Sequence, residues 1–207
     1  MNYLFTFTKK EIHDILYSTL ALGFIFSIGN VGGVFGALSD PIGYLSFAIL
    51  LTVIVGLSFI PHELMHKFTA MKYGAWAQYE MWKKGLMFAL VLAIITNGSF
   101  VFAAPGAVMI YTHYRDQQGM MHNVRLTKRQ NGFIASAGVV ANLTIAGACL
   151  LLAPGNSIAM TIAYINSFLA MFNMIPIPPL DGSKVIWWSI PVWVVLFAAS
   201  LGLQALV

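Results

Sequence analysis

Long apolar runs separated by three polar patches dominate the pattern of this 207-residue chain. A helix needs about 20 apolar residues to cross the roughly 30 Å hydrocarbon core of a bilayer. Runs of that length occupy residues 15–35, 42–66, 133–153, 158–177 and 185–207. The pattern therefore predicts an all-α multi-pass membrane protein with about five to six transmembrane helices.

A further apolar run, residues 86–104, is interrupted by Asn97-Gly98 and is followed by Pro105-Gly106, which are strong turn signals. Basic polar patches lie before and after it, at residues 67–84 and 115–129, and basic loops of membrane proteins face the cytoplasm. Two loops on one side of a membrane cannot flank a single crossing. We therefore expect a re-entrant or β-hairpin element here.

The composition agrees with a membrane protein. Hydrophobic residues make up 59% of the chain and charged residues only 9%, against about 25% in ordinary soluble domains. The net charge of +4 is accounted for by cytoplasmic loops, so we expect no nucleic-acid partner. The single cysteine, Cys149, cannot form a disulfide within the chain.

Two acidic residues, Glu63 and Asp181, have no simple explanation as loop residues. An ionisable side chain at membrane depth costs several kcal/mol, so each indicates a functional site. Glu63 lies in the sequence His62-Glu63-Leu64-Met65-His66, which is an HExxH motif. On a helix both histidines face one side and can bind one Zn²⁺, and Glu63 beside them can act as a general base. Two histidines at this spacing also occur on ordinary helices.

A catalytic zinc needs a third protein ligand. Asp181 is the preferred candidate, because the prolines of the preceding segment 173–180 end the helix and leave free carbonyl groups that favour a polar cavity. The alternative for Asp181 is a plain helix-ending turn. The other possible ligands lie in polar patches or far along a helix: His13, His113, His122, Glu80 and Cys149.

Three motifs in order, HELMH, AGVVAN and NMIPIPPLDG, resemble the site-2 protease family of intramembrane zinc metalloproteases. The resemblance covers residues 42–184 and implies a three-helix catalytic core, one Zn²⁺ held by His62, His66 and Asp181, and Glu63 as base. The family usually has proline where this chain has Val139.

The resemblance also implies roles for two asparagines, Asn142 and Asn173. Asn142 could donate to the developing oxyanion, or it could form an interhelical hydrogen bond. Asn173 could bind the substrate backbone or brace the proline turn. The segment 100–111, with β-branched and aromatic residues around a Pro-Gly turn, suits a strand edge that binds an extended substrate, with a lipid-facing hairpin as the alternative.

These features predict a single domain, residues 1–207, without a separate soluble domain, because neither cytoplasmic loop reaches about 50 residues. The expected function is hydrolysis of peptide bonds in or near the transmembrane segments of membrane proteins, at a site nearer the cytoplasmic side. The alternative is a non-catalytic zinc-binding membrane protein, either a transporter or an inactive protease relative. The expected partners are a transmembrane protein substrate and the lipid bilayer, whereas substrate identity and oligomeric state are not predicted.

Overall fold

The computed structural model describes residues 6–30, 33–115 and 119–207, and most of these residues are helical. Three helices are long and apolar enough to cross a membrane: α1 (Lys9–Asn30), α3 (Pro41–Lys72) and α5 (Lys128–Leu152). Five other helices are shorter: α2 (Gly33–Ser39), α4 (Lys83–Ile95), α6 (Ser157–Asn173), α7 (Asp181–Trp188) and α8 (Ile190–Gln204).

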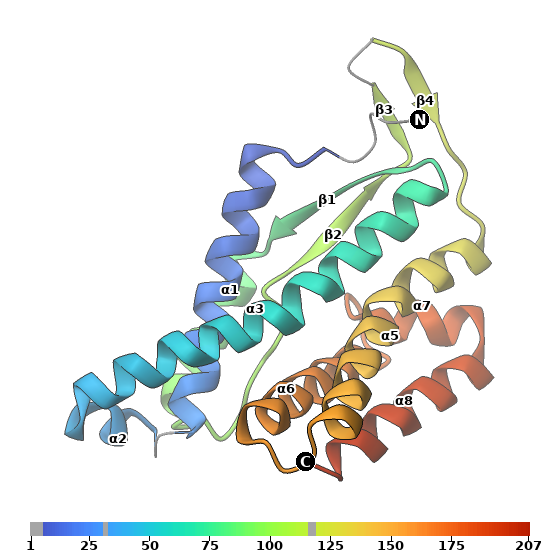
Figure 1. Cartoon of the computed structure of the whole chain (residues 1–207). Helices are drawn as coiled ribbons and strands as arrows, with labels where there is room; N and C mark the ends of the chain where they lie inside the picture. Colours follow the sequence, from blue (N-terminus) through green and yellow to red (C-terminus); the bar gives the residue numbers. More distant parts are fainter. Residues whose placement is uncertain (1–5, 31–32, 116–118) are drawn as a thin grey trace.

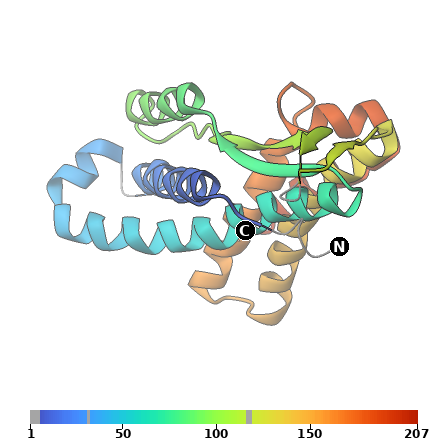
Figure 2. The ribbon, with the colours of Figure 1, turned by 90° about the horizontal axis from the view of Figure 1, so that it is seen from above.

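The longest helix, α3, extends through the middle of the molecule (Figure 1), and its 32 residues span about 48 Å. Asp40 caps its start, where the side chain accepts a hydrogen bond from the Gly43 amide, and Pro41 takes the first helical position. Helix α1 packs along one side of α3, and α5 and α6 pack on another. In the view from above, α1 lies between α3 and α4 (Figure 2).

The expected last two spans are shorter in the structure than in the sequence pattern. The run 185–207 is divided between α7 and α8, because Pro191 has no amide hydrogen and Ser189 adopts an extended conformation that caps the new helix. Helix α6 has 17 residues and ends at Asn173, before the end of the run 158–177. The first run also ends earlier than expected, at Asn30, and residues 31–32 lie outside the described residues.

The fold is not purely helical. Strand β1 (Trp76–Met81) pairs antiparallel with β2 (Gly106–Tyr111), and β3 (His113–Arg115) pairs with β4 (Met121–Asn123). The expected extended segment 100–111 becomes a strand only from Gly106 onward. Strand β1 was not predicted, because it lies in a patch that its lysines marked as a cytoplasmic loop.

The segment between β1 and β2 returns to its starting point. Met81, the last residue of β1, lies opposite Gly106, the first residue of β2. Between them, α4 has 13 residues and spans only about 20 Å. This segment therefore leaves and re-enters the sheet at one place, which is the path of a hairpin.

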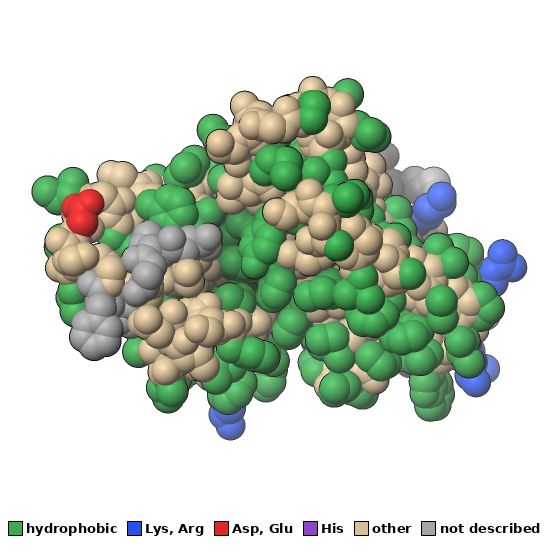
Figure 3. Space-filling view, turned by 90° about the horizontal axis from the view of Figure 1, so that it is seen from below, with side chains coloured by type: hydrophobic (Ala, Val, Ile, Leu, Met, Phe, Trp, Pro, Cys, Tyr) green, Lys and Arg blue, Asp and Glu red, His purple; other side chains and the backbone are tan. Residues whose placement is uncertain are grey.

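The surface carries many exposed hydrophobic side chains, especially along α1, α3, α4 and α8. In the view from below, hydrophobic side chains cover much of the molecule and the few charged ones lie near its outline (Figure 3). Such an apolar surface is unusual for a monomeric soluble protein and is compatible with contact with lipid.

Candidate metal centre

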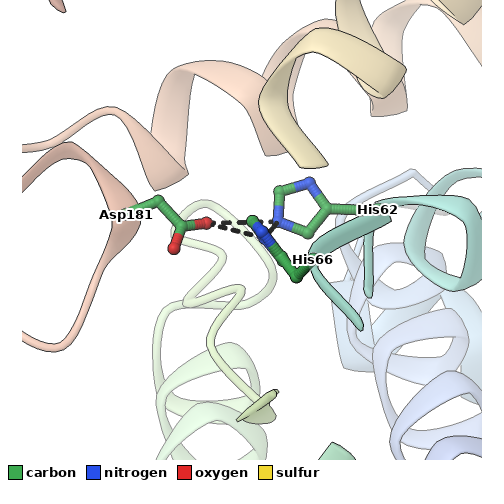
Figure 4. Close-up of side chains that lie close together, drawn as sticks. All are labelled: His62, His66 and Asp181. Atoms are coloured by element: carbon green, nitrogen blue, oxygen red, sulfur yellow. Dashed lines mark hydrogen bonds and ion pairs between the residues drawn. The ribbon is translucent and has the colours of Figure 1, made fainter. Parts of the chain in front are cut away.

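Three side chains from distant parts of the chain converge at one point. His62 and His66 lie one turn apart on α3, and Asp181 is the first residue of α7. All three are buried, and their side chains point toward one another (Figure 4). The two Nε2 atoms are 3.0 Å apart, and Asp181 Oδ2 lies 3.4 Å from His62 Nε2 and 2.9 Å from His66 Nε2.

These distances fit one zinc ion. Ligands at about 2.0–2.1 Å from a tetrahedral zinc lie roughly 3.4 Å from one another. The three measured separations of 2.9 to 3.4 Å are close to that spacing, and two imidazoles with one carboxylate are a typical catalytic zinc set. The residues therefore fit a single Zn²⁺, with three protein ligands and one position left for water or substrate.

Helix α5 orients the histidines. His66 Nδ1 lies 2.7 Å from the Ile134 carbonyl oxygen, so this nitrogen donates a hydrogen bond and leaves Nε2 available to the metal. Gly138 packs directly against both imidazoles. A Cβ atom at this position would lie 2.5 Å from His66 Nε2 and 2.9 Å from His62 Cδ2, so only glycine allows α5 to approach so closely.

The turn before α7 places the carboxylate. A Cβ atom on Gly182 would clash with the Met174 carbonyl oxygen, so glycine lets Asp181 fold back against the end of α6. Lys184 Nζ donates to Asp181 Oδ1 at 3.1 Å, while Oδ2 faces the histidines. Burial by itself raises the pKa of Asp181, but His66, His62 and Lys184 outweigh it and hold this pKa well below its usual range. The carboxylate is therefore ionised, as a metal ligand must be.

Glu63 stands beside the histidines and lines the same cavity. It is 7% exposed, and its Oε2 atom has no hydrogen-bond partner within the described residues. A buried carboxylate oxygen without a partner is costly, and from the cavity wall this atom can accept a hydrogen bond from a water or substrate group.

The cavity in front of these groups has a volume of about 750 Å³. Its walls come from α3, from β2 with the residues before it, from the start of α5, from the end of α6, and from the turn before α7 with α7 itself. Lys184 and Lys128 also line it. A cavity of this size accommodates several residues of an extended peptide.

The two predicted asparagines have different surroundings. Asn173, at the end of α6, lines the cavity, and its Nδ2 donates to the Leu169 carbonyl oxygen at 2.9 Å. Asn142 is fully buried and is not among the residues that line the cavity. Neither of its amide atoms has a hydrogen-bond partner among the described residues.

The remaining candidates for the third ligand lie elsewhere. Of the described residues, only His62, His66 and Asp181 form a group that could hold a metal ion. Glu80, for example, accepts a hydrogen bond from the Tyr111 hydroxyl instead. The roles of the Ile134 carbonyl and of Lys184 were not predicted from the sequence. Lys184 lies three residues after Asp181, a spacing at which oppositely charged side chains on a helix can meet, so its contact with Asp181 was predictable.

The two histidines and the aspartate therefore define a site that fits one zinc ion. A comparison with known proteins agrees: the chain is 37% identical over 210 residues to "Putative zinc metalloprotease MJ0611" of Methanocaldococcus jannaschii, covering 96% of this chain and 95% of the relative. The chain belongs to the zinc metalloprotease family that this relative represents. No family model and no solved structure matches it.

Proposed function

We propose that this protein is an intramembrane protease of the site-2 protease type, which hydrolyses peptide bonds in or near transmembrane segments of membrane proteins. The observation that supports this most strongly is the position of the HExxH motif. His62, Glu63 and His66 belong to a 32-residue apolar helix, α3, and face a cavity that the β2 strand also lines.

In this proposal His62, His66 and Asp181 hold Zn²⁺, which when bound polarises the scissile carbonyl and lowers the pKa of water. Glu63 accepts the proton of the attacking water through its unpartnered Oε2 atom and delivers it to the leaving amine. The burial of Glu63 keeps bulk water away from this proton transfer. Asn173 contacts the substrate from the cavity wall.

The open edge of β2 offers a binding site for an extended substrate. In an antiparallel pair, residues of the non-hydrogen-bonded pairs point their backbone groups away from the partner strand. The register makes Gly106, Val108 and Ile110 such residues of β2, and all three line the cavity. A substrate helix hides its carbonyls in its own hydrogen bonds, so unwinding and pairing with β2 would expose the scissile bond to the metal.

The bilayer and a transmembrane protein are the partners in this proposal. The basic residues on both sides of the 82–105 hairpin favour a cytoplasmic location for that end of α3, and therefore an active site nearer the cytoplasmic side.

The decisive experiment incubates the purified protein with a tagged single-pass membrane protein, with and without a zinc chelator. The proposal expects cleavage that the chelator abolishes and added zinc restores. A protein that binds zinc stoichiometrically but cleaves no membrane substrate would instead be a non-catalytic zinc-binding protein. Cleavage of soluble unfolded peptides but never of membrane-embedded ones would contradict the intramembrane assignment alone.

A further inference from the structure

Helix α1 covers the outer edge of β1 with three polar side chains. Glu11 Oε1 accepts a hydrogen bond from the Tyr79 amide at 3.1 Å, and Asp14 Oδ2 accepts one from the Met81 amide at 3.2 Å. Ser18 accepts a hydrogen bond from the Tyr79 hydroxyl at 2.8 Å. The spacing of three and four residues places these three groups on one face of α1.

These contacts cover the β1 edge of the sheet, whereas the β2 edge stays open. Tyr79 and Met81 belong to non-hydrogen-bonded pairs of the β1–β2 ladder, so their amides point away from β2. An exposed strand edge of this kind is a template for pairing with another chain. The carboxylates of α1 cover the outer edge of β1, whereas the outer edge of β2 faces the cavity.

Glu11 also forms an ion pair with α3, the helix that carries His62 and His66. Lys67 follows the metal ligand His66, and its Nζ donates to Glu11 Oε1 at 2.7 Å and to Oε2 at 2.5 Å. It also donates to the Thr6 carbonyl oxygen at 3.0 Å and lies 4.1 Å from the centre of the Phe7 ring. The side chains of Lys67 and Glu11 are 1% and 0% exposed. Glu11 therefore joins α1, the edge of β1 and the helix of the metal ligands at one point.

Stability alone is a weak reason for such a pair. Replacing a buried ion pair by hydrophobic residues of similar size is often neutral or stabilising. What a hydrophobic pair cannot supply is a directional acceptor for the Tyr79 amide together with a fixed link to α3. The pair is therefore better explained by the geometry that it imposes on the sheet.

We propose that Glu11 and Lys67 are positioning residues, which hold the open edge of β2 at a set distance from His62, His66 and Asp181. This inference rests on the proposed function, because the geometry matters only if an extended substrate binds along β2. The pair touches neither metal nor substrate, and it acts through β1.

Two variants separate positioning from stability. The double-methionine variant, Glu11→Met with Lys67→Met, removes the acceptor and the link but leaves no unpaired charge, so the fold should be retained. Glu11→Gln keeps a carbonyl acceptor for the Tyr79 amide and for Lys67 but leaves the buried lysine without a counter-charge, so it should lower the melting temperature. Ser27→Ala is the matched control, since it removes a partly buried α1–α3 hydrogen bond, to the Tyr44 hydroxyl, without touching the sheet.

Each variant is assayed on two peptides, one long enough to pair along residues 106–110 and one capped dipeptide that reaches only the metal centre. In the double-methionine variant we expect kcat/KM for the long peptide to fall about tenfold through KM, the effect of losing one or two net hydrogen bonds. The dipeptide rate and the zinc content should stay unchanged. Glu11→Gln and Ser27→Ala should keep the wild-type ratio of the two rates.

An equal loss on both peptides, or no loss on either, would overturn the positioning role. The proposed function fails if the wild-type protein does not cleave the single-pass membrane substrate, and amide hydrogen exchange of residues 76–81 then tests the positioning role by itself. In the double variant the Tyr79 amide should exchange at least about tenfold faster than in the wild-type protein, because its acceptor, Glu11 Oε1, is gone. Unchanged exchange would refute the inference independently of activity.

Discussion

Glu63 is the proposed base, and its replacement should lower catalysis without changing zinc binding. Glu63 lies beside the ligands but is not part of the group that holds the metal. Glu63→Gln should therefore lower kcat by about 10²–10⁴-fold, the usual contribution of a general base, while zinc content stays stoichiometric. Turnover measured together with elemental analysis tests this, and normal turnover would exclude Glu63 as the base.

Gly138 should control metal affinity although it is no ligand. A methyl group there would meet His66 Nε2, so Gly138→Ala should displace both imidazoles and weaken zinc binding by about 10–100-fold, as changes next to metal ligands often do. Gly147→Ala is the control, because it lies on the same helix and a Cβ atom there meets nothing within 4 Å. Chelator competition would measure both affinities, and equal values would contradict the expectation.

The two asparagines should behave differently on substitution. Asn173 lines the cavity, so Asn173→Ala should lower kcat/KM, by about tenfold for a lost hydrogen bond to substrate. Asn142→Ala removes a buried amide that has no partner among the described residues, so it should leave kcat unchanged and not lower the melting temperature. A loss of about 10²-fold or more in kcat for Asn142→Ala would instead assign it to the oxyanion.

At the scale of elements, the open edge of β2 can be blocked without breaking the sheet. Val108 points its amide away from β1, so Val108→Pro removes a hydrogen bond that only an added strand would use. We expect KM for an extended substrate to rise while zinc content is unchanged. Met109→Ala serves as the control, since it keeps the backbone amide that faces β1. Unchanged KM in Val108→Pro would show that the substrate does not pair with this edge.

The element scale also explains why the strands were the hardest part to predict. The sequence 76–81 combines aromatic and polar residues next to lysines, and nothing local distinguishes it from a loop. Its stability depends on two neighbours far away in the chain, β2 on one edge and the carboxylates of α1 on the other. Strand propensity reflects such packing more than local sequence.

The whole molecule has a topology that follows from closure of the 82–105 hairpin. Met81 lies opposite Gly106, so in the proposed membrane setting we expect the residues before and after the hairpin to lie on one side of the bilayer. With Cys149 replaced by alanine, single cysteines at the exposed positions Lys72 and Asn123 should react with an impermeant thiol reagent from the same face of oriented vesicles. A cysteine at Ser157, beyond α5, should react only from the opposite face. Labelling of Lys72 and Asn123 positions from different faces would contradict this topology.

The sequence by itself determined the apolar helical character of the protein and the composition of its metal centre. Both depend on local rules: long apolar runs form helices, histidines four residues apart share a helix face, and prolines end a helix before Asp181. The structure brings His62, His66 and Asp181 together, in the combination that the sequence predicted.

Only the tertiary structure decided how that centre is supported. Three features support it: the contact of Gly138 with the imidazoles, the hydrogen bond from His66 to the Ile134 carbonyl, and the position of Asn173 in the cavity wall. Each brings together residues that lie far apart in the chain, so no local pattern predicts it. Likewise, Lys67 and Glu11 look like ordinary loop and helix-end charges in the sequence. They pair only because the packing of α1 against α3 removes both from solvent, and a buried charge must then find its partner.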